Sequence, residues 1–260
     1  MKKFFLSTLG AVSVLSLWLF SCTQKDSEIT SIEDLSGKKI GVQSGTTSES
    51  YIQKNIQDSF IIEYSTGYDA AAALTAKKID AIIIDELPAK SIVARNDNLK
   101  IIKGNFAEEE YAIAVRKGDK ELLDSINKTI ASIKKDGRYK LLVNSFISVE
   151  GKIQIPNFKE PDTEEKLIMG TNAAFPPFEY MTFESDRIIG FDISLGQIIA
   201  GEYGKKLEIV DKSFDLLIPA LQTGAIDFIA AGMSATADRK QAVDFSVPYY
   251  KSKQVIIVRK

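Results

Sequence analysis

The sequence predicts an α/β fold made of two lobes. Short apolar strands alternate with helical segments along most of the chain, which is the pattern of sheets covered by helices. Residues 73–85 and 220–232 repeat one design, in which the end of a helix, a turn and an Ile-Asp pair lead into a buried strand. A stretch rich in Gly, Pro and charge at 148–165 looks like a linker. These observations indicate two lobes of related construction.

The first half of the chain contains the clearest strand signal. The segments 39–43 and 81–84 are predicted strands, and 46–56 and 68–76 are predicted helices. Because 81–84 is fully apolar, we expect it to be covered on both faces, as parallel strands are. Apolar residues that share one face predict an amphipathic helix over 119–135, which ends near Gly137.

After the linker the alternation of strands and helices resumes. The predicted strands are 167–170, 207–210, 228–231 and 254–258, and the predicted helices are 192–203 and 215–223. In open α/β sheets ligands bind beyond the carboxyl ends of the strands. Asp85 and Gly232, at the two ends of the repeated pattern, are therefore expected to face each other across a cleft.

The N-terminus carries an export signal. Two lysines precede an apolar stretch over 4–20, which is typical of a signal peptide. The Leu-Phe-Ser-Cys string at 19–22 resembles a lipobox, so we expect 1–21 to be removed and Cys22 to carry a lipid anchor. Residues 22–34 would then be a tether, and the protein would be periplasmic or at the cell surface. The alternative for Cys22 is a free thiol.

The composition excludes several kinds of site. The chain has no histidine and one cysteine, so a histidine-dependent triad, zinc sites of the His/Cys type and an internal disulfide are excluded. A net charge of −2 does not indicate the basic surface that nucleic-acid binding requires. We expect no metal and no cofactor.

Three strand ends combine turns with hydroxyl or amide groups, at 43–47, 170–175 and 231–234. Backbone N–H groups at helix starts attract carboxylates, and the guanidinium of Arg239 suits bidentate pairing with a carboxylate. Asp85, at the end of an apolar strand, suits an ammonium group. Two plainer interpretations stay open: Arg239 pairs with Asp238 or Asp244, and Asp85 caps a helix. Phe175 and Phe214 are either pocket walls or core residues.

Several ordered blocks resemble one family. They are Gly-Thr-Asn-Ala-Ala-Phe-Pro-Pro-Phe-Glu-Tyr at 170–180, Gly-Phe-Asp-Ile at 190–193, Leu-Ile-Pro-Ala-Leu-Gln at 217–222, Ala-Gly-Met-Ser-Ala-Thr-Ala-Asp-Arg at 231–239, Asp-Phe-Ser at 244–246 and Asp-Leu-Ser-Gly-Lys-Lys-Ile-Gly-Val-Gln-Ser-Gly-Thr-Thr at 34–47. Together they resemble the polar amino-acid-binding proteins of ABC importers, family 3 of the periplasmic binding proteins. The resemblance covers nearly all of the chain after the signal and implies the type II two-lobe fold.

The order of the blocks differs from that of the family. The blocks of the family's second lobe come first, which indicates a circular permutation. We expect the family's second lobe over 35–112 and its first lobe over 113–260, with the linker at 148–165 joining the usual termini. One covalent crossing between the lobes is expected near 111–118, with the strand 254–258 beside 112–115 in a two-strand hinge.

The resemblance also implies roles for individual residues. Arg239 would bind the ligand α-carboxylate with the backbone N–H groups of Ser234 and Thr47, and Asp85 would bind the α-ammonium with the Gly232 carbonyl and the Ser234 hydroxyl. Phe175 and Phe214 would be aromatic walls. The positions implied to tune specificity are Asn172, Glu179 and Gln43. Relatives that read a cationic side chain often have Asp where Asn172 stands, so the resemblance does not imply a strictly basic ligand.

The resulting hypothesis is a monomeric, lipid-anchored solute-binding protein without enzymatic activity. It would bind an L-amino acid, polar or basic, and deliver it to the permease of an ABC importer. Two alternatives belong to other classes. One is a dehydratase-type enzyme on the same fold with Glu179 as general acid, and the other is a ligand sensor or adhesin.

Overall fold

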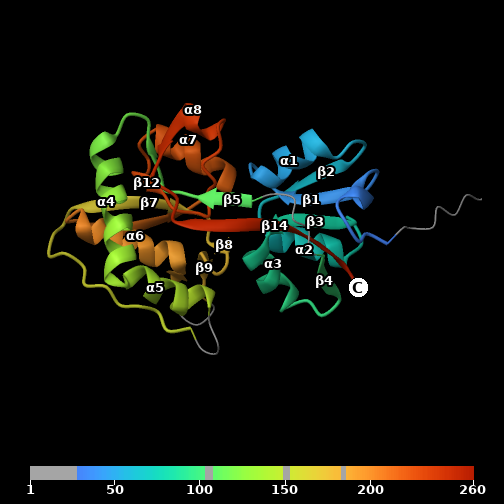
Figure 1. The fold of residues 1–260 in the computed structure, drawn as a ribbon, viewed down its shortest axis with the longest axis horizontal. Helices are drawn as coiled ribbons and strands as arrows, with labels where there is room; N and C mark the ends of the chain where they lie inside the picture. Colours follow the sequence, from blue (N-terminus) through green and yellow to red (C-terminus); the bar gives the residue numbers. More distant parts are fainter. Residues whose placement is uncertain (1–27, 103–107, 149–152, 183–185) are drawn as a thin grey trace, which may run out of the picture.

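The computed structural model describes residues 28–102, 108–148, 153–182 and 186–260. Two α/β lobes lie side by side in Figure 1. We call them the N-lobe, which is built mainly from residues before 103, and the C-lobe, which is built mainly from residues after 111. The signal peptide and Cys22, predicted as the lipid anchor, lie outside the described residues.

The N-lobe sheet has the strand order β2-β1-β3-β14-β4. Its strands are β1 (Lys39–Gln43), β2 (Phe60–Tyr64), β3 (Ala81–Asp85), β4 (Leu99–Ile102) and β14 (Tyr250–Arg259). Its helices are α1 (Thr47–Asn55), α2 (Gly67–Thr75) and α3 (Glu86–Val93), with a short 3-10 turn at Glu33–Leu35 before them. The predicted strands and helices of this region are thus confirmed to within one residue at each end.

The C-lobe sheet has the order β11-β7-β12-β6-β13. Its strands are β6 (Ala114–Arg116), β7 (Lys166–Thr171), β11 (Lys206–Asp211), β12 (Phe228–Ile229) and β13 (Val243–Phe245). Its helical segments are α4 (Lys120–Asp136), α5 (Arg138–Leu142), a π-helical turn (Val143–Ile147), α6 (Phe191–Glu202), a 3-10 turn (Phe214–Leu216), α7 (Leu217–Gln222) and α8 (Arg239–Ala242). A small sheet of β8 (Ala174–Phe175), β9 (Glu179–Met181) and β10 (Ile188–Ile189) lies beside it.

Both faces of β3 are buried, as its apolar sequence predicts. Ile82 and Ile84 pack in the apolar cluster on one face of the N-lobe sheet, and Ala81 and Ile83 pack in the cluster on the other. Successive strand side chains point to opposite faces, so a strand apolar at every position fits only between two covered faces.

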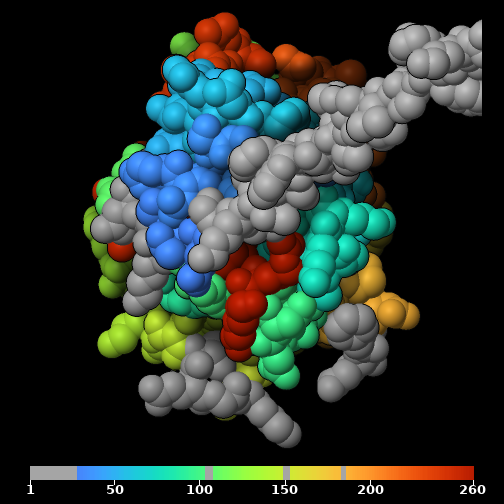
Figure 2. Space-filling view, turned by 90° about the vertical axis from the view of Figure 1, so that its right-hand side faces the viewer, coloured from blue at the N-terminus to red at the C-terminus, as the bar shows by residue number. Residues whose placement is uncertain are grey.

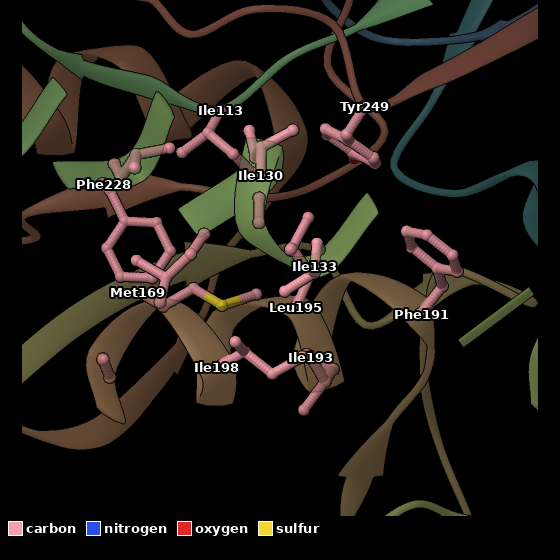
Figure 3. Packing of buried hydrophobic residues seen from close by; sticks show 14 of the residues in the cluster. Ile113, Ile130, Ile133, Met169, Phe191, Ile193, Leu195, Ile198, Phe228 and Tyr249 are labelled. Atoms are coloured by element: carbon pink, nitrogen blue, oxygen red, sulfur yellow. The ribbon is translucent and has the colours of Figure 1, made fainter. Parts of the chain in front are cut away.

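The predicted amphipathic helix forms as α4. The Asp119 side chain caps its start by accepting a hydrogen bond from Leu122 N, and Gly137 ends it with a positive φ of 91°, a conformation that favours glycine. Its apolar face packs in the C-lobe core, where Figure 3 shows Ile130 and Ile133 near Leu195 of α6.

The internal repeat corresponds to equivalent units in the two sheets. In the N-lobe, α2 leads into β3, which pairs with β1 in parallel. In the C-lobe, α7 leads into β12, which pairs with β7 in parallel. The carboxyl ends of β3 and β12 both face the region between the lobes.

The expected hinge is wrong in one respect. Residues 254–258 do not lie beside 112–115; Gln254–Ile257 pair with β3, and Ile256–Arg259 pair with β4. Ala114–Arg116 instead pair with β12 and β13. Since Val255 and Ile257 pack in one N-lobe cluster and Ile256 and Val258 in the other, burial of this apolar run places it in the middle of the N-lobe sheet.

The end of the chain consequently belongs to the N-lobe sheet and not to a C-lobe that runs from 113 to 260. Within the described residues two strands link the lobes, where one crossing is expected: β5 (Glu108–Tyr111) pairs antiparallel with Tyr250–Lys253, the first part of β14. Figure 2 shows the red C-terminal residues set among blue and green residues from the first part of the chain.

Residues 153–165 contain no helix or strand, in agreement with a linker over this part. No helix of the described ranges is apolar over a length that would cross a membrane.

Candidate functional site

One cavity between the lobes collects every ligand-binding residue that the sequence predicts. The N-lobe contributes the end of β1, the start of α1 and the end of β3, and the C-lobe contributes the ends of β7 and β12, the small sheet and α8. The ten predicted residues that line it are Gln43, Thr47, Asp85, Asn172, Phe175, Glu179, Phe214, Gly232, Ser234 and Arg239.

The lobes are closed on one another around this cavity. Its free space is about 20 Å³, enough for little more than one water molecule. The Gln43 amide donates to Asn172 Oδ1 across the lobes at 2.8 Å, and Arg239 Nη2 donates to the Gly45 carbonyl at 2.9 Å. A ligand the size of an amino acid therefore needs the lobes to open or the lining side chains to move.

Arg239 points into the cavity region from the first turn of α8. Its Nη1 donates to the Ser234 carbonyl at 2.9 Å, and its guanidinium lies 5.2 Å from the centre of the Phe214 ring, a cation–π distance. Burial lowers the pKa of Arg239, while the negative charges of Glu109 and Asp85 oppose the shift. The alternative partner Asp244 is instead paired with Lys117 at 2.8 Å.

Asp85 lies at the N-terminus of α3, but its side chain makes no capping hydrogen bond, so the helix-cap interpretation is wrong. Its Oδ1 accepts a 2.6 Å hydrogen bond from Ser252 Oγ. Burial and the negative charge of Glu109 raise the pKa of Asp85 to about 7. A cationic group placed in the cavity would favour the ionised carboxylate.

Glu109 is a cavity residue that the sequence analysis missed. It lies on β5 and is 8% exposed. Its carboxylate accepts hydrogen bonds from the hydroxyls of Thr47 and Ser234 and from Gln254 Nε2, the last at 2.7 Å. The sequence signal that could have identified Glu109 is the run of three glutamates before Tyr111. Side chains alternate between the two faces of a strand, so on a strand between the lobes one of the three glutamates points inward.

The aromatic wall depends on the small sheet. Phe175 on β8 pairs with Glu179 on β9, which brings both side chains to the cavity. Gly232 faces the same ring: it has a φ of +54°, and a Cβ there would lie 2.8 Å from Phe175 Cε1. A larger residue at 232 would therefore displace the ring as well as strain the backbone.

Two carboxyl groups are buried behind the cavity. Asp192 Oδ2 accepts hydrogen bonds from Gly232 N at 2.8 Å and from the Tyr249 hydroxyl at 2.6 Å, and burial raises the pKa of Asp192 to about 6. Burial first, and then the charge of Asp192, raise the pKa of Glu179 well above 4.5. Neither Glu179 oxygen accepts a hydrogen bond from another described residue. Burial and the neighbouring Asp192 therefore favour the protonated form of Glu179.

The described residues contain no cluster of three or more His, Cys, Asp or Glu side chains arranged to hold a metal ion. The chemistry available in the cavity is thus that of hydroxyl, amide, carboxyl and guanidinium groups between two aromatic rings.

The sequence matches a protein family over most of its length. The model of the bacterial extracellular solute-binding proteins, family 3, matches residues 49–149 and 167–260.

Individual relatives match over shorter spans. The arginine-binding extracellular protein ArtP of Bacillus subtilis (strain 168) is 42% identical over 97 residues, which cover 37% of each chain. The L-cystine-binding protein TcyJ of Escherichia coli (strain K12) is 32% identical over 152 residues, 57% of this chain and 56% of that protein. The chain thus spans between about one third and somewhat more than half of the length of these curated relatives.

Solved structures match in part as well. A mutant of ArgBP from T. maritima has 37% sequence identity and a TM-score of 0.32, with 47% of this chain and 41% of that chain covered.

Proposed function

The chain belongs to the bacterial extracellular solute-binding proteins, family 3, and from this premise we propose that it binds an L-amino acid between its lobes and delivers it to the permease of an ABC importer. The lobes would open and close about the paired strands β5 and β14, a hinge closure around the ligand.

One observation carries this proposal: Asp85 and Arg239 line a single cavity from opposite lobes. A zwitterion has one group for each, an α-ammonium for Asp85 and an α-carboxylate for Arg239. We assign the backbone N–H groups of Thr47 and Ser234 as further donors to the carboxylate. Thr47 is the first residue of α1, and the free N–H groups of a first helical turn favour anions. The Gly232 carbonyl would accept from the ammonium. Closure then gains from both ends of the ligand only when both charges are present.

The remaining lining residues suit a polar or basic side chain. Phe175 and Phe214 would sandwich the aliphatic part of such a side chain, while Gln43, Asn172 and Glu179 offer polar groups around its end. The names of the relatives agree with this class, since one is an arginine-binding and one an L-cystine-binding protein.

A thermal-shift panel of the common L-amino acids tests the proposal. A ligand that binds only the folded protein stabilises it by about 2.7 kcal/mol at 100 times its Kd, so the true ligand gives a clear rise in melting temperature. The Arg239→Ala variant should show no rise with the same ligand. A wild-type protein that responds to none of the amino acids would contradict the proposal.

We also propose that Cys22 is lipid-modified. Growth with an alkyne fatty acid, followed by click labelling, should label the full-length wild-type protein and not the Cys22→Ser variant. Equal labelling of both proteins would contradict the lipid anchor.

We propose the circular permutation on the positions of residues 28 and 260. Lys260 N donates to the Asn98 carbonyl at 2.8 Å, and Glu28, the first described residue, pairs with Lys100 at 2.9 Å, so residues 28 and 260 both lie at β4. In an unpermuted ancestral chain residue 260 would have been connected to residue 28, so a permutation requires these two residues to lie close together. A rearranged chain that starts at 166 and joins 260 to 28 through a short Gly/Ser linker should fold and give the same ligand response; failure to fold would contradict this history.

A further inference from the structure

The chain segment that carries Gly232 leaves its sheet before it reaches the cavity. Strand β12 ends at Ile229, and Ala230 N still donates to the Gly170 carbonyl of β7 at 3.2 Å. The next three residues form neither a helix nor a strand, although Ala231 and Gly232 line the cavity. Because buried backbone groups need hydrogen-bond partners, this segment depends on partners outside the sheet.

A buried carboxylate is the partner of Gly232. Gly232 N donates to Asp192 Oδ2 at 2.8 Å, and one residue further on the Met233 carbonyl accepts a 3.0 Å hydrogen bond from Ala112 N. These two bonds hold the backbone on both sides of the Gly232 carbonyl. They restrict a residue that, with a φ of +54° and no Cβ, would otherwise have more backbone freedom than any other.

Asp192 reaches Gly232 from behind the cavity wall. It is the second residue of α6, it is fully buried, and it does not itself line the cavity. Its backbone N donates to the carbonyl of Phe178 at 2.9 Å, which fixes the start of α6 beside β9. Since the N-terminal end of a helix stabilises negative charge, a carboxylate is a suitable acceptor at this place.

The same carboxylate oxygen also contacts the residue that precedes the crossing strand β14. The Tyr249 hydroxyl donates to Asp192 Oδ2 at 2.6 Å. The ring of Tyr249 stacks on that of Phe191, with the centroids 6.0 Å apart and an angle of 14° between the planes, so the hydroxyl has a fixed direction. One oxygen thus joins the strand that links the lobes to the backbone that lines the cavity.

Building on the proposed function, in which the Gly232 carbonyl accepts from the α-ammonium, we propose that Asp192 is a positioning residue for this half of the site. Its Oδ2 holds the N–H of Gly232 and thereby aims the carbonyl of the same residue, and Tyr249 orients the Oδ2. Asp192 strengthens recognition of the ammonium without contacting the ligand, so it should not affect a ligand that lacks the ammonium.

Amide hydrogen exchange, followed by NMR at single residues, tests the backbone contact without any ligand. In Asp192→Ala the Gly232 amide should exchange at least about tenfold faster, because it loses a hydrogen bond to a charged group. The Ala230 amide, which donates to Gly170, should keep its wild-type protection. Circular dichroism verifies that the variant is folded. Unchanged protection of Gly232 in the folded variant overturns the proposal.

Titration calorimetry tests the effect on recognition, with L-arginine and with 5-guanidinopentanoate, which is arginine without its α-ammonium. Asp192→Ala should lower the preference for L-arginine over the acid by up to about tenfold. Asp192→Asn keeps an acceptor oxygen and should restore most of that preference. Equal weakening of both ligands by Asp192→Ala would show a general structural role and overturn the proposal. The same loss of preference in Asp192→Asn would assign the effect to charge and overturn it as well.

Tyr249→Phe tests the link to the crossing strand with a smaller change. It should lower the preference for L-arginine about threefold, because Oδ2 loses one of its two donors. Tyr139→Phe is the matched control, since it removes a hydroxyl that donates to the Tyr249 carbonyl at 2.7 Å, and it should keep the wild-type preference. If Asp192→Ala does not fold, an unchanged preference in Tyr249→Phe overturns the proposal. If L-arginine does not bind the wild type, the ligand class of the proposed function is wrong, and hydrogen exchange alone decides the role of Asp192.

Discussion

Ser252 Oγ donates a 2.6 Å hydrogen bond to Oδ1 of Asp85, and this bond joins the crossing strand β14 to the end of β3. The contact fixes the orientation of a buried carboxyl whose pKa is about 7. Ser252 favours the ionised form, but burial and Glu109 outweigh it, so the site gains a full negative charge at Asp85 only when a cation arrives or the pH rises.

The affinity for an amino acid should therefore increase as the pH rises from 5.5 towards 7.5. Below pH 7 Asp85 binds a proton that must be released before it can pair with an α-ammonium, which costs affinity up to about tenfold per pH unit. Titration calorimetry at several pH values measures the slope. Asp85→Asn should bind weakly and with a flat profile between these pH values; an equally steep profile in this variant would show that another group titrates.

Replacement of Arg239 by Ala should abolish binding and keep the fold. Loss of one partner of a buried charge pair costs about 2–5 kcal/mol, which predicts at least a roughly 30-fold weaker Kd. Lys240→Ala is the matched control, because it removes a neighbouring cation that does not line the cavity. Equal loss in both variants would point to a general charge effect rather than to a specific contact.

Ile256→Ala should destabilise the N-lobe. Ile256 is fully buried on β14 between β3 and β4, and truncation of such a side chain costs about 2–5 kcal/mol. Denaturant unfolding should show this loss, whereas Val247→Ala, at a site that is 47% exposed, should change little. A stable Ile256→Ala protein would mean that the C-terminal strand is only a peripheral hinge.

Glu179→Gln should reduce the dependence of stability on pH. The pKa of Glu179 in the folded protein is raised well above 4.5, so its contribution to stability is complete below that value and declines as the pH rises towards the folded pKa. Melting temperatures at pH 5, 6.5 and 8 should fall less steeply in Glu179→Gln than in the wild type. Glu208→Gln, which removes an exposed carboxylate, should keep the wild-type slope.

Local patterns in the sequence were sufficient for most elements. The alternation of strands and helices, the capped and glycine-ended α4 and the fully apolar β3 are local features, and each formed where expected. The helix expected over 215–223 divides into a 3-10 turn and α7 at Leu217. The strand expected over 228–231 is confined to Phe228–Ile229.

Long-range pairing was harder to predict. The run Val255–Val258 is apolar at every position, so it fits the middle of either lobe, and periodicity does not say which strands it joins. The structure pairs it with β3 and β4. Glu109 escaped prediction for the same reason, since its inward direction depends on the pairing of β5 with β14. The candidate residues taken from strand ends converged because the two parallel units place those ends together.

The most direct test of the central claim is a calorimetric comparison of three related ligands. The amino acid that gives the largest thermal shift is titrated beside its decarboxylated amine and its deaminated acid. If Arg239 and Asp85 bind the two ends of one zwitterion, each analogue should bind at least about 30-fold more weakly than the intact amino acid, in line with the cost of an unpaired buried charge. An analogue that binds as tightly as the amino acid would contradict the account.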